Sequence, residues 1–409
     1  MSQDCQFHPF IPEKPMKILF LSYSFEPDLG ACAFRNSHLF HELLKHLDKD
    51  DYVRVISTVP NRYSSFSLDV PFEEKGDNYM ITRLPIPKHG NGMKGQIKAF
   101  TSYYRGVRRI VGKEKYDLVY ATSAKLFTAY LGRKMSYKMK CPLYLDIRDL
   151  FVDNIGDIFA TKRIAGRLLV RIMSRIERYT FSKANHINLI SEGFRPYFEK
   201  YPKPEYSFFT NGIDDLFLES GNNRTQESHK PYVITYAGNI GTGQSLDKVI
   251  PDAALKLGDG YLFRIIGDGG TLPLLKERIE KLGVRNVELR SPVKRDEIIS
   301  YYLESDFLYL QLNDLDCFTK VLPSKIFEYG AFDKPIIAGV AGFTRQFIEK
   351  NVPNCILYHP NDVDGMVEGI KNYNVKFQVR DDFRRDFRRD QLDSKMADSI
   401  IRVASVPLH

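Results

Sequence analysis

The segment from Pro323 to Ala338 carries the side chains best suited to chemistry in this chain. Proline is well placed at the start of a helix, because its missing N–H would have no partner there. The amides of Ser324 and Lys325 would point out of the positive end of that helix, where they could bind a phosphate. Glu328 lies one helical turn beyond Lys325, so its carboxylate could accept both hydroxyls of a ribose on the same side. The pattern fits a nucleoside diphosphate, and an ordinary capped helix with a surface Lys–Glu pair would give the same pattern.

A buried strand is expected directly after this helix. Residues 333–335 (Asp-Lys-Pro) would end the helix, and residues 336–340 (Ile-Ile-Ala-Gly-Val) form a short apolar run. Such a run is typical of a strand covered on both faces of a parallel sheet. Ligands of these sheets lie at the carboxyl ends of the strands, so the helix start should border a binding cleft.

The pattern Pro-Ser-Lys-x-x-Glu-Tyr-x-Ala at residues 323–331 resembles the donor-sugar-nucleotide motif of the retaining glycosyltransferases of family 4. Within that family it is most similar to the bacterial enzymes that build O-antigen and capsule repeat units. The resemblance implies the α/β GT-B fold, in which two Rossmann-like, doubly wound domains face each other across a cleft. It also implies transfer of a sugar from a nucleotide-diphosphate donor, with retention, to a lipid-linked or saccharide acceptor in surface polysaccharide synthesis.

Composition sets the broad class of the protein. With 409 residues, 43% of them hydrophobic and 27% charged, the chain is expected to form two globular domains. Its scattered cysteines predict neither a disulfide framework nor a zinc site, and they favour a reducing compartment. They are Cys5, Cys32, Cys141, Cys317 and Cys355. No apolar run reaches the roughly 20 residues that span a bilayer, and the first 15 residues lack the apolar core of a signal peptide.

The alternation of expected strands and helices predicts how the chain is divided. The expected segments are a leader (1–15), an N-terminal acceptor-binding Rossmann-like domain (16–212), a hinge and linker (213–230), a C-terminal nucleotide-sugar domain (231–380) and a C-terminal helical segment (381–409). The hinge resembles the family's N-G-[VI]-D segment at Asn211 to Asp214. The resemblance further implies that the last helix packs back onto the first domain.

Three turns with glycines follow expected strands and are candidates for donor contact. The first contains Gly30 and has no G-x-G-x-x-G fingerprint, which argues against a dinucleotide oxidoreductase. The second begins at Gly238, and the third contains Gly267 and Gly269. Glycines let backbone amides approach a phosphate closely, and plain tight turns would explain them equally well.

The second turn departs from the family pattern. Most family 4 members carry Arg where Asn239 stands and Lys where Gln244 stands, and those cations balance the diphosphate; the O-antigen branch tolerates the residues present here. The positive charge must then come from elsewhere, and the candidates are Lys325, Lys320 and Arg35.

Lys320 also occupies a position that the family's E-x7-E motif gives to its first Glu, because it precedes Glu328 by eight residues. In the family that Glu contacts the donor hexose, so the role is either lost or passed to Asp314 or Asp316. Lys320 could instead hold a phosphate or be a solvated loop lysine.

The loop at residues 146–153 resembles the family's R-D-[LI]-W-P-x-[ES] segment. Asp149 within it could orient or deprotonate the acceptor hydroxyl, or it could simply cap the loop. In the mechanism supposed for the family, the leaving phosphate itself helps to remove the acceptor proton, so a single catalytic base need not exist. We expect neither a metal nor a cofactor, because helix ends and lysines can neutralise the leaving diphosphate and no D-x-D motif stands at a strand end.

The segment from Lys162 to Lys183 is strongly basic. Arginines recur every four residues at 163, 167, 171 and 175, and apolar side chains do the same beside them at 164, 168, 172 and 176. A helix with this pattern could lie on an anionic membrane, or it could pack its apolar ridge in the core and leave its arginines solvated.

The predicted partners follow from the resemblance and the charge. We expect a nucleotide-sugar donor, with a UDP-sugar as the first choice, a polyprenyl-diphosphate-linked sugar acceptor and no nucleic acid. A net charge of +8 suits an anionic partner without choosing among lipid, nucleic acid and phosphorylated substrate. The scattered cysteines favour the cytoplasm, and the resemblance implies action at the inner leaflet, so a peripheral position on the inner membrane is a further expectation.

Two other functions stay open. A non-hydrolysing sugar-nucleotide 2-epimerase shares the fold but would need a cluster of catalytic acids and histidines, and the nine histidines are scattered here. A non-catalytic GT-B subunit that stabilises a partner would explain the missing cations and the missing first Glu.

Overall fold

An eight-stranded sheet forms the first part of the structure, a computed structural model that describes residues 14–28, 31–60, 70–87, 93–123, 126–153, 165–221 and 230–406. The spatial order is β3-β4-β2-β1-β5-β6-β7-β8, and only the β3–β4 pair is antiparallel. The strands are β1 (Lys17–Leu21), β2 (Tyr52–Thr58), β3 (Glu73–Lys75), β4 (Tyr79–Leu84), β5 (Leu118–Thr122), β6 (Leu143–Ile147), β7 (His186–Leu189) and β8 (Glu205–Ser207).

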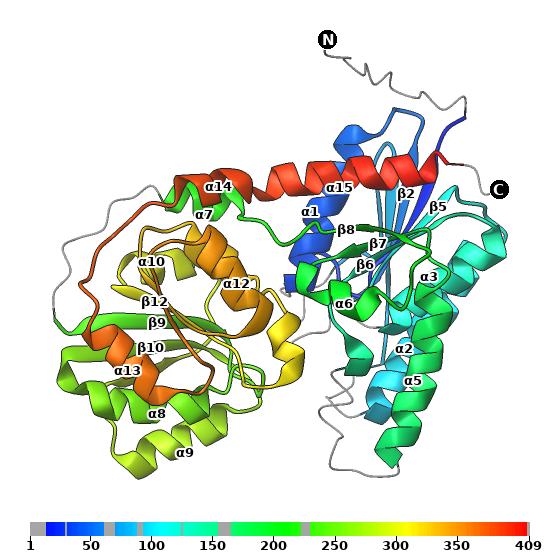
Figure 1. Cartoon of the computed structure of the whole chain (residues 1–409). Helices are drawn as coiled ribbons and strands as arrows, with labels where there is room; N and C mark the ends of the chain where they lie inside the picture. Colours follow the sequence, from blue (N-terminus) through cyan, green and yellow to red (C-terminus); the bar gives the residue numbers. More distant parts are fainter. Residues whose placement is uncertain are drawn as a thin grey trace.

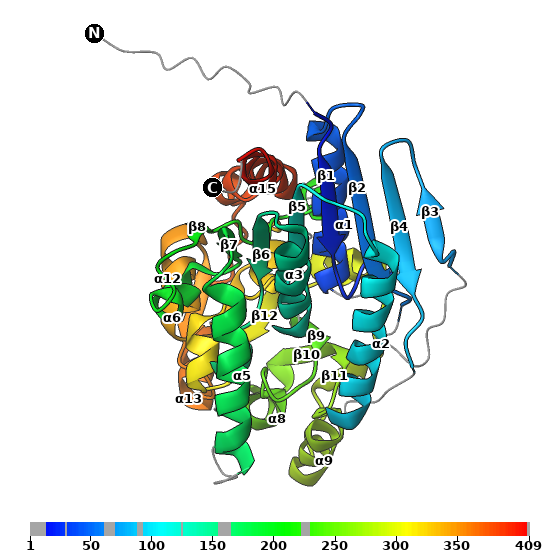
Figure 2. The ribbon, with the colours of Figure 1, turned by 90° about the vertical axis from the view of Figure 1, so that its right-hand side faces the viewer.

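Helices cover both faces of this sheet (Figure 2). On one face lie α2 (Met93–Val111), α3 (Leu126–Met139) and α5 (Ala165–Phe181); on the other lie α1 (Ala31–His46) and the last helix, α15 (Arg389–Ala404). Successive side chains of a strand point to opposite faces. Leu19 and Leu21 of β1 therefore pack in the cluster under α2 and α3, while Ile18 and Phe20 pack under α1 and α15.

A six-stranded, fully parallel sheet forms the second domain, in the order β11-β10-β9-β12-β13-β14. The strands are β9 (Tyr232–Asn239), β10 (Tyr261–Asp268), β11 (Val287–Arg290), β12 (Phe307–Gln311), β13 (Ile336–Gly339) and β14 (Cys355–Tyr358). The helices are α7 (Asp215–Ser220), α8 (Leu246–Leu257), α9 (Leu272–Leu282), α10 (Glu297–Leu303), α11 (Lys325–Gly330), α12 (Gly342–Asn351) and α13 (Val363–Lys371). The prediction of two doubly wound α/β domains is confirmed.

The chain crosses between the domains twice, and the two crossings are hydrogen-bonded to each other. The amide of Ile213 donates to the carbonyl of Phe387 at 2.7 Å, and the amide of Arg389 donates to the carbonyl of Ile213 at 3.0 Å. This pairing lies within the expected C-terminal helical segment (381–409), which is divided into α14 (Asp381–Asp386) and α15. Figure 1 shows α15 returning across the first domain, where it packs on α1.

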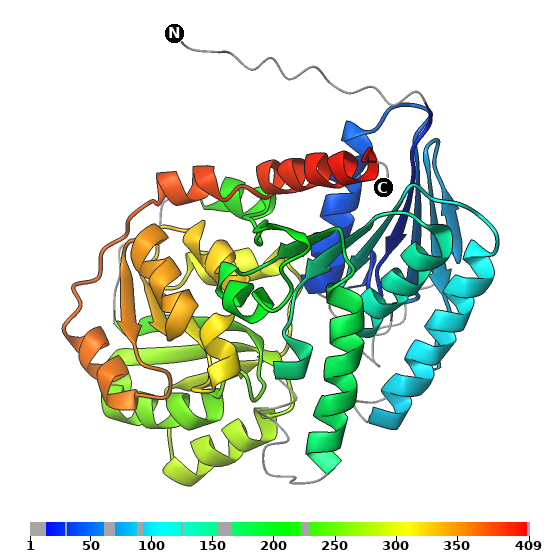
Figure 3. The same ribbon diagram turned by 45° about the vertical axis from the view of Figure 1, so that its right-hand side comes forward.

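The loops after β6 and β7 contact the second domain at the junction. Ser191 Oγ donates to the carbonyl of Lys320 at 2.7 Å, and the 3₁₀ turn Glu192–Phe194 lies against α12 (Figure 3). A Cβ at Gly193 would come within 2.5 Å of that same carbonyl, so only glycine permits this approach. Among the described residues, no helix has the length and apolarity needed to cross a bilayer.

Candidate active site

Lys325 and Glu328 meet at the start of α11, as their spacing predicts. Lys325 Nζ lies 2.7 Å from Glu328 Oε2, and the buried Tyr302 hydroxyl donates to the same oxygen at 3.3 Å. Both charged side chains keep some exposure, 27% for Lys325 and 17% for Glu328. Burial alone would raise the pKa of Glu328, but the charges of Lys325 and Arg295 lower it, so the group is a carboxylate at neutral pH.

The helix itself begins at Lys325 with Ser324 as its N-cap, two residues later than a start at Pro323 would give. The amides of Ile326 and Phe327 donate to the carbonyls of Pro323 and Ser324. The preceding amides, of Ser324 and Lys325, therefore point out of the helix start. An anion placed there would meet two N–H groups and one ammonium.

The turn after β9 lies beside this helix start. A Cβ at Gly238 would be 3.6 Å from Lys325 Cε, so the lysine stem passes directly over the glycine. Asn239 Nδ2 donates to Gln244 Oε1 at 3.0 Å, which joins the two ends of the turn. The residues that stand in place of the family's two cations thus bind each other.

The side-chain amides of Asn313, which is buried, and Asn361, which is half-buried, hold the same turn in place. Asn313 accepts from Asn361 Nδ2 at 3.0 Å and donates to the carbonyl of Thr242 at 2.9 Å. Asn361 also accepts from Ser245 Oγ at 2.6 Å. These positioning residues were not identified from the sequence, because they come from segments more than 45 positions apart and match no spacing rule.

Gly267 and Gly269 lie next to this turn and are explained by close backbone packing. A Cβ at Gly267 would come within 1.9 Å of the Gly238 carbonyl oxygen, and one at Gly269 within 2.3 Å of that of Ile240. The two glycines allow the ends of β9 and β10 to approach each other. Their structural role is therefore clear, and direct contact with a donor stays a prediction.

Lys320 takes a different role from the one expected. Its ammonium lies 2.8 Å from Asp153 of the first domain and 2.8 Å from Asp316. Burial would lower the pKa of Lys320, but the hydrogen bonds to these carboxylates raise it. In this arrangement Lys320 links the domains and its charge is already balanced. Asp316, a proposed substitute for the missing Glu, is bound to that lysine, while Asp314 is exposed with His359 Nε2 4.0 Å away.

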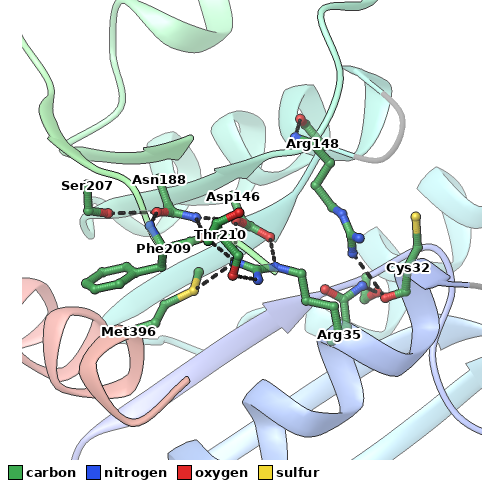
Figure 4. Close-up of polar contacts among 12 residues, drawn as sticks. Cys32, Arg35, Asp146, Arg148, Asn188, Ser207, Phe209, Thr210 and Met396 are labelled. Atoms are coloured by element: carbon green, nitrogen blue, oxygen red, sulfur yellow. Dashed lines mark hydrogen bonds and ion pairs between the residues drawn. The ribbon is translucent and has the colours of Figure 1, made fainter. Parts of the chain in front are cut away.

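Arg35 is the clearest correction to the sequence-based prediction, because its guanidinium has no access to a ligand (Figure 4). Only 1% of the side chain is exposed. Arg35 contacts both oxygens of Asp146 at 3.3 and 3.4 Å and donates to the carbonyls of Phe209 and Thr210 at 2.8 and 2.7 Å. Asn188 binds the same carboxylate at 2.7 Å. Arg35 therefore fastens α1 and β6 to the hinge. Gly30, also predicted, lies outside the described residues.

Asp149 follows β6 at the junction. Its side chain is exposed to solvent on one side, while neighbouring protein groups reduce its hydration. This crowding raises the pKa of Asp149 to about 6, and the neighbouring Arg148 offsets part of the effect. A carboxyl group with that pKa can exchange a proton near neutral pH.

An interdomain arginine that the sequence did not reveal lies nearby. The guanidinium of Arg295 lies 4.9 Å from the ring of Phe34 on α1 and 4.9 Å from that of Phe217 on α7, and it pairs with Asp214 of the hinge. Arg389 of α15 binds the same carboxylate. No local motif connects these segments, so only the fold brings them together.

Comparison with known proteins places these features in a family context. Residues 220–385 match the family model of glycosyl transferases group 1. The putative colanic acid biosynthesis glycosyl transferase WcaI of Escherichia coli K12 is 21% identical over 384 residues, which cover 87% of this chain and 91% of that protein.

Solved structures share the fold. Anabaena Alr3699/HepE in complex with UDP and glucose has a TM-score of 0.64 and 15% identity, covering 95% of this chain and 100% of that one. The apo form of the lipopolysaccharide outer core galactosyltransferase WaaB has a TM-score of 0.62 and 14% identity, covering 95% and 99%. The two domains described above thus form a GT-B fold.

Proposed function

We propose that this glycosyltransferase, whose residues 220–385 form a group 1 glycosyl transferase domain, moves a sugar from a nucleotide-diphosphate donor, with retention, to a polyprenyl-diphosphate-linked saccharide. WcaI is named for colanic acid biosynthesis, and HepE is described in complexes with UDP, with UDP and glucose, and with UDP-glucose. These names support a UDP-sugar donor and a product in surface polysaccharide synthesis.

The start of α11 carries the proposal for the donor. The diphosphate would accept from the amides of Ser324 and Lys325 and from the Lys325 ammonium. Lys325 would turn from Glu328 toward phosphate, which frees the Glu328 carboxylate to accept two ribose hydroxyls. Because Gly238 has no side chain, the Lys325 stem can pass close to the turn and bring its ammonium to the phosphates.

The reaction needs charge stabilisation more than it needs a strong base. The acceptor oxygen bonds to the anomeric carbon while the bond from that carbon to the phosphate oxygen breaks, so negative charge develops on the leaving diphosphate. Lys325 and the two amides would stabilise that charge. The acceptor proton would pass to the leaving phosphate on the same face of the sugar, with Asp149 orienting the hydroxyl.

The surface of α5 supports contact with an anionic membrane. Arg167, Arg171 and Arg175 are exposed, while Arg163 and Ile164 lie outside the described residues. Leu168 and Ile172 are 59% and 46% exposed, so this part of the apolar ridge is not packed in the core. A helix with exposed leucine and isoleucine beside arginines suits the boundary between lipid headgroups and acyl chains.

Tyrosines on the neighbouring helix α3 extend the same surface. Tyr137 is 69% exposed, and Arg133 lies 5.2 Å from its ring. Lys134 lies 5.0 Å from the ring of Tyr179 on α5. Aromatic rings with cations above them are suited to the interfacial region of a bilayer.

A panel of UDP-, GDP- and TDP-sugars tests the proposed function. The purified protein should be thermally stabilised by one donor in preference to the others and should hydrolyse it slowly without an acceptor. An epimerase would convert its sugar nucleotide instead, and a non-catalytic subunit would ignore the whole panel. Either of these results would overturn the proposal.

A further inference from the structure

A cavity of about 760 Å³ lies between α2 and the end of β4. In the order of strands, β4 lies toward the other edge of the first sheet from β6, which Asp149 follows. One wall is apolar and stiff, because it is made by Leu84, Pro85 and Pro87. A Cβ at Gly106 would come within 2.6 Å of Leu84, so the glycine sets how closely the helix approaches the strand.

The other wall is one face of α2. Lys98, Arg105 and Arg109 line the cavity there, together with the hydroxyls of Thr101 and Ser102. These residues recur at intervals of three and four positions, so they lie on the same side of the helix. The Thr101 hydroxyl donates to the carbonyl of Ile97 at 2.8 Å, so the Ser102 hydroxyl is the further donor that this face offers to an anion.

Among the described residues, the three cations have no carboxylate partner. In the part of the chain that the structure describes, no carboxylate lies within ion-pair distance of Lys98, Arg105 or Arg109. α2 itself contains no acidic residue, whereas Arg83 nearby pairs with Glu74 at 2.9 Å. Like charges on one helix face repel each other, so the cavity favours a multiply charged anion.

We propose that this cavity binds the diphosphate of an isoprenoid diphosphate ester, the lipid-linked acceptor. The assignment rests on the proposed function. A cationic wall facing an apolar wall suits an amphiphile with a diphosphate joined to a hydrocarbon chain, and the volume exceeds what the diphosphate alone would fill.

The position of the cavity also limits the acceptor. β4 and β6 are separated by four strand-to-strand steps through β2, β1 and β5, which amounts to roughly 19 Å. Leu84 and Asp149 lie at the carboxyl ends of these two strands. If the diphosphate lies in the cavity while the reacting hydroxyl lies at Asp149, more than one sugar must separate them. The enzyme would thus extend an acceptor that already carries several sugars.

Calorimetric titration with inorganic pyrophosphate tests the site, with saturating UDP present to block the donor site. The variant Lys98→Gln/Arg105→Gln/Arg109→Gln should bind pyrophosphate about tenfold more weakly or worse than wild type. A matched control is Arg108→Gln/Lys113→Gln/Lys115→Gln, which removes the same charge from exposed positions outside the cavity and should bind as wild type does. Ser102→Phe, which fills the cavity and keeps all three cations, should also weaken binding.

A second arm separates the acceptor diphosphate from a lipid headgroup. Sedimentation with phosphatidylglycerol vesicles should be reduced equally by the two triple variants, because they remove equal charge. The proposal would be overturned in favour of a headgroup site by two results together. The wild-type protein would not bind pyrophosphate, and only the cavity variant would lose vesicle binding. Equal pyrophosphate binding by wild type and both triple variants would also overturn it. UDP affinity, measured in the same proteins, reports separately on the proposed donor site.

Discussion

Three neighbours stabilise the Glu328 carboxylate. Lys325 and Tyr302 hydrogen-bond to it, and the positive charges of Lys325 and Arg295 also favour its ionised form. Glu328→Ala should weaken UDP binding by roughly ten- to a hundred-fold, because a charge-assisted hydrogen bond contributes about 1.5 to 3 kcal/mol. Isothermal titration calorimetry with UDP measures the change. Glu349→Ala removes an exposed carboxylate from α12 and serves as the control. Wild-type UDP affinity in a folded Glu328→Ala protein would exclude Glu328 from the donor site.

The two lysines that seemed equivalent in the sequence should now differ in effect. Lys325→Ala should lower UDP affinity by about tenfold, because Lys325 is the ammonium at the helix start. Lys320→Ala should leave UDP affinity close to wild type, because its charge is already balanced by Asp153 and Asp316. Titration of each variant with UDP measures both effects. A large loss of UDP affinity in Lys320→Ala with little loss in Lys325→Ala would identify Lys320 as the phosphate ligand instead.

The raised pKa of Asp149 predicts that activity falls as the pH is lowered. Its pKa of about 6 means that the carboxylate form dominates above that pH and is lost below it. If the carboxylate orients the acceptor hydroxyl, kcat/KM for the acceptor should fall as the pH drops through 6. Asp149→Asn should be slower and should lack this acidic limb. An unchanged pH profile in Asp149→Asn would show that another group titrates.

At the scale of elements, α5 gives a test of membrane contact. Arg167, Arg171 and Arg175 changed together to Gln should weaken sedimentation with anionic vesicles, since each arginine near the surface contributes on the order of 1 kcal/mol. Binding by wild type should also fall steeply with added salt. Donor hydrolysis should be unaffected.

A matched triple change on the other domain controls for net charge. Lys276, Lys281 and Arg285 are exposed on and just after α9. Changing them to Gln removes the same charge and should leave vesicle binding largely intact. Equal losses of vesicle binding in the two triple variants, or no vesicle binding by wild type, would show that α5 carries an ordinary solvated face and no membrane site.

The elements that the sequence predicts well are those whose signal is local. Buried strands and the spacing of Lys325 and Glu328 depend on neighbouring residues, and both expectations agree with the structure. The expected C-terminal helical segment (381–409) is divided between α14 and α15, where Ile213, more than 170 positions away, is hydrogen-bonded to Phe387 and Arg389. Helix propensity depends only on the residues of the segment itself, so it cannot reveal such a long-range partner.

Side-chain roles at the domain junction were harder to predict for the same reason. Arg35 and Lys320 were expected to serve the donor because cations were missing elsewhere, yet both have carboxylate partners more than 100 positions away. Arg295 and Asn313 match no motif. Arg295 meets Asp214 of one crossing and Phe34 of α1, whereas Asn313 meets Asn361 within the second domain. Sequence patterns locate a charge along the chain, but only the fold determines its partner.

For the whole molecule, we predict that sugar transfer depends on the start of α11 facing an acceptor held by the first domain. Transfer of a radiolabelled sugar from the preferred nucleotide donor to a polyprenyl-diphosphate-linked saccharide is the most direct measurement of this claim. Wild type and Glu349→Ala should move label into the organic phase, and Glu328→Ala should move little at the same donor concentration. Full transfer by Glu328→Ala, or none by wild type with any donor of the panel, would contradict the account.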